Sequence, residues 1–157
     1  MTNEILGSRL EGSTLVVETQ AGETRYDCRF LIAALLIFVA RGSGSIEPEE
    51  SGKMIELIEE HFHMEGGESL ELLTHAMSEL ADNPSLGRLL AELGPKLSEH
   101  DKEIIALMGL KVVAADGTRQ YSEMEQFNRA MEAVGVPPEI VHRAFDRYFA
   151  ETMPGGT

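Results

Sequence analysis

The most apolar stretch of the sequence, residues 30–40 (FLIAALLIFVA), restricts the possible folds more than any other feature. It contains no charged residue, and Arg29 and Arg41 lie at its two ends. A helix needs about 20 apolar residues to cross a membrane, so this stretch is much too short to insert into one. We therefore expect a buried helix over residues 27–41 that the rest of the chain covers.

Glycine and proline residues divide the following sequence into further helical segments. Between these breaks, apolar residues recur every three or four positions, which is the spacing of one helix face. The breaks fall at Gly42, Gly44, Gly66, Gly67, Pro84, Gly94, Pro95, Gly135 and Pro137. In the last segment, the residues expected on the core side are Val141, Ala144, Phe145, Tyr148 and Phe149. The pattern predicts an all-α domain of about seven helices over residues 28–153, followed by a flexible tail over residues 154–157.

Residues 1–27 have a different character. Residues 14–19 (TLVVET) are rich in β-branched side chains, and a turn signal at residues 20–22 (QAG) leads into residues 24–26 (TRY). Strand formers on both sides of turn residues are typical of a hairpin. We expect a short N-terminal extended arm or hairpin outside the helical domain.

The charge of the chain is strongly negative and unevenly distributed. The formal net charge is −14, and residues 47–82 contain eleven acidic side chains against the single Lys53. Such a surface repels phosphate backbones and anionic lipid headgroups, which argues against nucleic acid as a partner. The favoured interpretation is a solvated helix face that keeps the protein soluble, and the alternative is a surface that attracts divalent cations or a basic protein.

The N-terminus and the cysteine content predict the compartment. The first ten residues (MTNEILGSRL) contain no basic stretch followed by an apolar one, so we expect no secretory signal. Cys28 is the single cysteine and therefore cannot form an internal disulfide. Both features favour a reducing cytoplasm, without direct insertion into a membrane.

Two segments of the chain align with each other as an internal repeat. Residues 40–50 (ARGSGSIEPEE) and 113–125 (VAADGTRQYSEME) each combine the end of an apolar helix, a glycine-containing loop, one hydrophobic residue and an acidic helix start. The alignment pairs Gly44 with Gly117, Ser43 with Asp116, and Glu50 with Glu125. We expect two helix-loop-helix repeats related by a pseudo-two-fold axis, each covering the apolar face of the other.

This duplicated pattern resembles the tellurite-resistance TerB family, whose related domain precedes J-domains in some bacterial co-chaperones. The resemblance covers residues 30–152. It implies an all-helical domain in a bacterial cytoplasm, a role in stress or metal response, partners among membrane proteins, acidic sites for divalent metal and no defined reaction. The first loop departs from the family pattern because Gly42 and Ser43 replace Ala and Asp. The second loop departs from it because Arg119 and Gln120 lengthen the connection. Both departures weigh against a symmetric pair of metal sites.

The second loop contains the better candidate ligands. An EF-hand is excluded, because its first and third ligand positions would be Val112 and Ala114. The EF-hand argument does not exclude a less regular cation site, in which oxygen atoms of the loop would bind Ca²⁺, Mg²⁺, Mn²⁺ or Zn²⁺. Its candidate ligands are Asp116 with Glu123 or Glu125, and the corresponding residues of the first loop are Ser43 and Glu50. The alternative, which we favour, is that Asp116-Gly117 only turns the chain, and Ser43 is in any case a poor ligand.

The sequence contains no motif that predicts catalysis. Two Glu-x-x-His pairs, Glu60/His63 and Glu139/His142, should face solvent, away from the apolar stripes of their helices. Cys28 opens the most apolar helix and should be a buried structural residue. Our leading hypothesis is therefore a non-enzymatic tellurite-resistance-type module that binds protein partners, including membrane-associated stress proteins, and weakly binds a divalent cation. The alternatives are a small hydrolase or other enzyme with a site at the repeat interface, and a metal-free interaction scaffold.

Overall fold

The computed structural model describes residues 5–41, 46, 48–79, 85–115 and 121–152. Three strands come first in the chain: β1 (Gly7–Glu11), β2 (Thr14–Thr19) and β3 (Gly22–Asp27). They are followed by the helices α1 (Cys28–Ala40), α2 (Pro48–Phe62), α3 (Gly66–Glu79), α4 (Ser85–Leu93), the short 3-10 helix η2 (Gly94–Lys96), α5 (Glu99–Val113), α6 (Tyr121–Val134) and α7 (Pro138–Thr152). Within the described residues, the mostly helical architecture and the number of α-helices agree with the prediction, but the expected N-terminal arm or hairpin is a three-stranded sheet.

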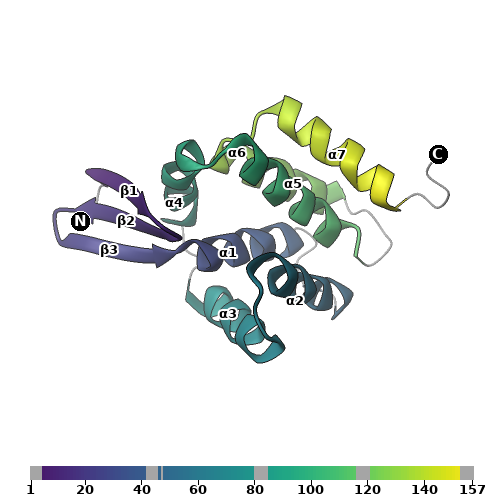
Figure 1. The fold of residues 1–157 in the computed structure, drawn as a ribbon, viewed down its shortest axis with the longest axis horizontal. Coiled ribbons are helices and arrows are strands. Elements are labelled where there is room, and N and C mark those ends of the chain that lie inside the picture. The colour runs from purple at the N-terminus through teal and green to yellow at the C-terminus, as the bar shows by residue number, and fades with distance from the viewer. Residues whose placement is uncertain (1–4, 42–45, 47, 80–84, 116–120, 153–157) are drawn as a thin grey trace.

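The buried helix expected over residues 27–41 is α1, which lies at the centre of the helical body (Figure 1). Asp27 caps its start, since Oδ1 accepts a hydrogen bond of 2.9 Å from the amide of Arg29. Nine of the 13 residues of α1 are buried, because α2, α3, α4, α5 and α6 all contact it. Among the described helices, none combines the length and the apolar character that crossing a bilayer demands.

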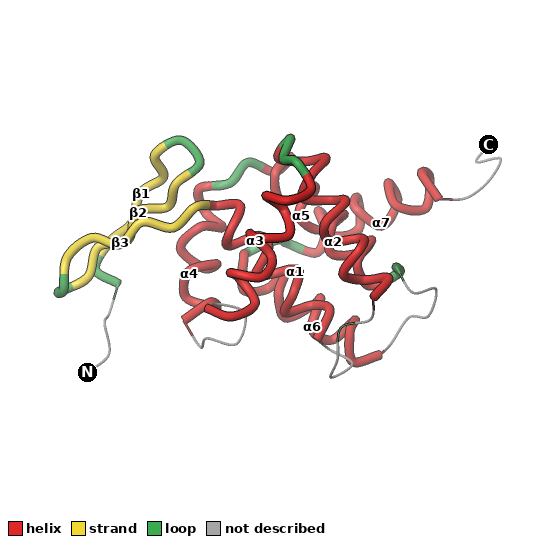
Figure 2. Tube along the Cα trace, turned by 90° about the horizontal axis from the view of Figure 1, so that it is seen from below, coloured by secondary structure: helices red, strands yellow, loops and turns green. Residues whose placement is uncertain are grey.

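The N-terminal strands form an antiparallel sheet in the order β1-β2-β3, at one end of the helical body (Figures 1 and 2). The predicted hairpin corresponds to β2 and β3, and β1 was missed. The segment of β1 (GSRLE) contains one large apolar residue, Leu10, and its last three residues are exposed, so it lacks the alternating pattern of a half-buried strand. Gly12, with φ of 61°, makes the turn between β1 and β2.

The central strand is buried on both faces of the sheet. Leu15 and Val17 point toward the helices and belong to the main core. Val16 is also 0% exposed, although it lies on the opposite face, where the register places it between Arg9 and Arg25. These two arginines form ion pairs with three glutamates of the same face, Glu11, Glu18 and Glu23. A layer of paired charges, with one negative charge in excess, thus covers the outer face of the sheet.

Two glycines permit close contacts of α6 with its neighbours. A Cβ atom on Gly94 of η2 would lie 1.9 Å from the carbonyl oxygen of Val134, and one on Gly109 of α5 would lie 2.9 Å from the ring of Phe127. The segment after α6 turns at Gly135, whose φ is 75°. These contacts fix the position of α6 against the rest of the body. The pseudo-two-fold relation of the two repeats stays a prediction; α1 contacts both α5 and α6, and α2 contacts α5.

Candidate functional site

The expected cation ligand of the first repeat, Glu50, lies in the first turn of α2 and is 0% exposed. Its neighbour Glu49 is exposed. A carboxylate at a helix N-terminus interacts favourably with the helix dipole, and a buried one also requires hydrogen-bond donors or a positive charge nearby. Ser43, the other candidate of this loop, lies outside the described residues. Nothing in the sequence pattern indicated that Glu50 would be buried, because the burial depends on the packing of distant helices.

The second repeat presents a different arrangement. Glu125 is exposed on α6, and the backbone of Glu123 belongs to the same helix, although its side chain lies outside the described part. Residues two positions apart on a helix point in nearly opposite directions, so one cation would use only one of the two. Asp116 lies outside the described residues. Within the described residues, there is no group of three or more His, Cys, Asp or Glu side chains arranged to hold a metal ion.

The two copies therefore differ at the pair of positions that the alignment equates. Glu50 is buried, whereas Glu125 is exposed. A metal site made in the same way by both repeats is not compatible with this difference. The asymmetry agrees with the sequence difference between the loops, in which Ser43 of the first aligns with Asp116 of the second.

The two Glu-x-x-His pairs face solvent as predicted, although His63 lies one residue after the end of α2, where its φ is 54°, and not on a helix face. Glu60, His63, Glu139 and His142 are all exposed. Cys28 is half-buried rather than buried, and burial together with the charge of Asp27 raises the pKa of its thiol. A thiol with a raised pKa is protonated at neutral pH and is a poor nucleophile. The burial predicted for Cys28 is thus only partly met, and its structural role stays a prediction.

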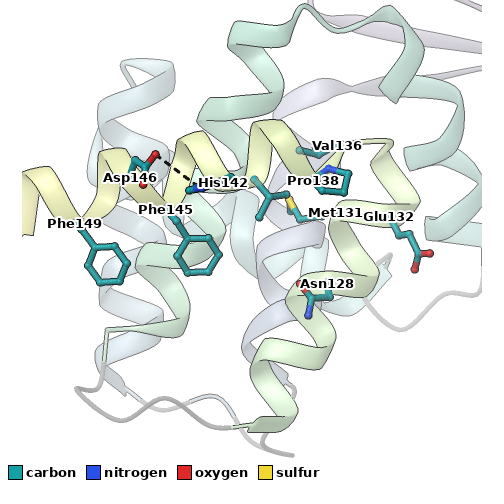
Figure 3. Close-up of a pocket in the computed structure, with 10 residues that line it drawn as sticks. Asn128, Met131, Glu132, Val136, Pro138, His142, Phe145, Asp146 and Phe149 are labelled. Carbon is teal, nitrogen blue, oxygen red and sulfur yellow. Dashed lines mark ion pairs between the residues drawn. The ribbon is translucent and has the colours of Figure 1, made fainter.

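A groove between α6 and α7 is the feature that the sequence did not predict (Figure 3). It has a volume of about 620 Å³, which is within the usual range of binding pockets. Its lining combines apolar with polar and acidic side chains: Asn128, Met131, Glu132, Val136, Pro138, Val141, His142, Phe145, Asp146 and Phe149. The groove is not at the interface of the α1–α2 and α5–α6 units, where an enzyme site was considered.

Three of the groove residues, Val141, Phe145 and Phe149, were expected on the core side of α7, and their exposure departs from that prediction to different degrees. Val141 and Phe145 are half-buried and pack against the main core, whereas Phe149 is 40% exposed. Among residues 138–151 of α7, Ile140 and Ala144 are the buried ones. The apolar stripe of α7 is therefore wider than the surface that the neighbouring helices cover.

Comparison with known proteins identifies a family. The family model described as "Tellurite resistance protein TerB" matches residues 29–146, which is most of the chain and runs from the second residue of α1 to the middle of α7. The three strands precede the matched region. Neither the curated proteins nor the solved structures yielded a match.

Proposed function

Since this chain belongs to the tellurite-resistance TerB family, we propose that it acts as a non-enzymatic stress-response module that binds protein partners in a bacterial cytoplasm. Its proposed partners are membrane-associated stress proteins. The observation that supports it is the groove between α6 and α7, which leaves the apolar side chain of Phe149 partly in water. Contiguous apolar surface that a folded monomer keeps exposed is typical of an interaction site.

The proposal is tested by purifying the tagged full-length protein, after chemical cross-linking, from its source bacterium grown with and without tellurite. The expected result is repeated recovery of the same few membrane or stress proteins, and not of an untagged control protein of similar charge. Recovery of no specific protein under either condition would contradict the partner-binding function. Purified protein that hydrolysed a panel of ester, phosphate and peptide substrates would contradict its non-enzymatic part.

The second part of the proposal is weak binding of a divalent cation at the repeat loops. It is supported by the buried Glu50 at the start of α2 and by the acidic start of α6. A cation at about 100 times its dissociation constant stabilises the native state by about 2.7 kcal/mol. For a chain of this size that gain raises Tm by about 5–10 °C.

The measurement is Tm of chelator-treated protein with and without Ca²⁺, Mg²⁺, Mn²⁺ or Zn²⁺. We expect one cation to raise Tm, and Asp116→Asn or Glu50→Gln to abolish the rise according to which loop binds it. Glu71→Gln on the exposed face of α3 is the matched control and should keep the full rise. If no cation raised Tm, the protein would be a metal-free scaffold and Asp116-Gly117 would only turn the chain.

A further inference from the structure

The shape of the α6–α7 groove fits an elongated ligand. Its lining residues on α7 extend from Pro138 to Phe149, which corresponds to about 16 Å, or three helical turns, at the rise of an α-helix. Met131 of α6 and Val136 of the α6–α7 connection line it, and the rings of Phe145 and Phe149 of α7 lie stacked, with their centroids 6.2 Å apart (Figure 3). A three-turn apolar trough has the length of the anchor face of one amphipathic helix.

The charge at the edges of the groove is negative. Glu132 and Asp146 are its acidic lining residues, and none of the residues that line it is Lys or Arg. Its one other ionisable side chain, His142, has Nδ1 3.6 Å from Asp146 Oδ2. Both acidic side chains are exposed, so they are accessible to a partner.

The arginines of α7 do not neutralise this edge, because they point to the other side of the helix. Arg143 forms ion pairs with Glu99 and Glu103 of α5 at 3.6 and 3.7 Å. Arg147 pairs with the same Glu103 at 3.3 Å and with Glu151 at 3.5 Å. The arginines of α7 thus face α5, whereas the side of α7 that lines the groove carries the acidic Asp146.

We propose that the groove binds an amphipathic helix of a partner protein, with apolar residues on Phe145 and Phe149 and with Lys or Arg residues beside Glu132 and Asp146. This inference rests on the proposed partner-binding function and adds the docking surface and the chemistry of the partner. Charge complementarity selects this occupant over a second copy of the chain, because two copies would each bring the same acidic edge and a net charge of −14.

The test uses two synthetic helical peptides of about 16 residues with the same leucines at i, i+4 and i+7. One peptide has Lys beside the leucines, and the other has Glu at the same positions. Affinity for the full-length protein is measured by fluorescence anisotropy, and the binding surface by chemical-shift changes of the ¹⁵N-labelled protein. We expect the Lys peptide to bind about tenfold more tightly than the Glu peptide at low salt and to shift resonances of α6 and α7.

Variants of exposed residues test the charge and the apolar surface separately. E132K/D146K should reverse the peptide preference, whereas E60K/E71K, which changes the net charge by the same amount on α2 and α3, should preserve it. Phe149→Ala should weaken binding of both peptides. Equal affinity for the two peptides, shifts confined to other helices, or a reversal by E60K/E71K would overturn the inference. A dimer seen by sedimentation and abolished by Phe149→Ala would do the same, because it would assign the groove to a second copy.

The same variants separate this inference from the function on which it rests. If wild type and a combined E132K/D146K/F149A variant recover the same cellular partners equally well, the partner-binding function stands and the groove assignment is overturned. If wild type recovers no partner at all, the proposed function itself fails.

Discussion

Replacing Gly94 by alanine should destabilise the protein severely, because the added methyl group has no space. Its Cβ would lie 1.9 Å from the carbonyl oxygen and 2.8 Å from the carbonyl carbon of Val134. A carbon–oxygen contact normally needs about 3.3 Å, so η2 and the end of α6 would have to separate by more than about 1 Å. The obstacle is helix backbone, which cannot change rotamer as a side chain does.

The size of the effect follows from this geometry. Overpacking of a core costs about 1–3 kcal/mol, and a clash with backbone belongs at the upper end of that range or above it. A loss of about 3 kcal/mol lowers Tm by about 6–12 °C in a protein of this size. Gly109→Ala should cost less, about 1–3 kcal/mol, because its Cβ would meet the ring of Phe127 at 2.9 Å, a buried side chain and not backbone.

A matched control is available in the same chain. Gly52 lies exposed within α2 and has no atom within 4 Å of the position of a Cβ, so Gly52→Ala should stabilise the protein by about 0.5–1 kcal/mol. All three variants are compared by thermal and urea denaturation followed by far-ultraviolet circular dichroism. A Tm of Gly94→Ala within about 2 °C of wild type would contradict the predicted clash with Val134, as would an equal loss of stability in Gly52→Ala and Gly94→Ala.

Two further predictions concern the N-terminal sheet and its junction with α1. Asp27→Ala removes the cap of α1 and should cost about 1 kcal/mol at neutral pH. Burial raises the pKa of Asp27, but its hydrogen bonds with Arg29 outweigh this and hold the pKa below its ordinary value. The stability that Asp27 contributes is therefore complete above about pH 4 and is lost as the pH falls through its lower native-state pKa. In urea denaturation, the difference in unfolding free energy between wild type and Asp27→Ala should become smaller below about pH 4. Val16→Ala should cost about 2 kcal/mol in the same assay, because the side chain is 0% exposed. The control is Arg25→Gln, in the exposed charged layer on the same face, which should leave stability nearly unchanged. Equal losses of stability for Val16→Ala and Arg25→Gln would contradict the assignment of Val16 to a buried position.

The parts of the fold that the sequence predicted are those that local chemistry determines. The length and ends of α1 follow from an uninterrupted apolar run after Asp27, which is both a cap and the end of a strand. Ser98 likewise caps α5, with Oγ accepting the amide of Asp101 at 3.1 Å. β1 escaped prediction because it is held by its pairing with β2 and by contacts with distant residues. Ser8, for example, donates a hydrogen bond of 2.8 Å to Glu92 and accepts one of 2.8 Å from Lys96.

The candidate sites were harder to predict, because each depends on which neighbour covers a given face. Glu50 and Glu125 occupy equivalent places in the sequence repeat, yet one is buried and the other is exposed. The cause is tertiary, since the repeat specifies the first turn of each helix but not the surroundings of that turn.

The groove has the same tertiary cause. Helical spacing placed Ala144, Phe145 and Phe149 on one apolar stripe of α7, and all three were expected in the core. Only the arrangement of the helices shows that Ala144 is covered completely, Phe145 in part and Phe149 least of all. Periodicity identifies which face of a helix is apolar, but it contains no information on the width of the surface that covers that face. An apolar stripe wider than its cover leaves a trough, and in this chain the trough lies beside two carboxylates, which makes a basic helix its best-matched ligand.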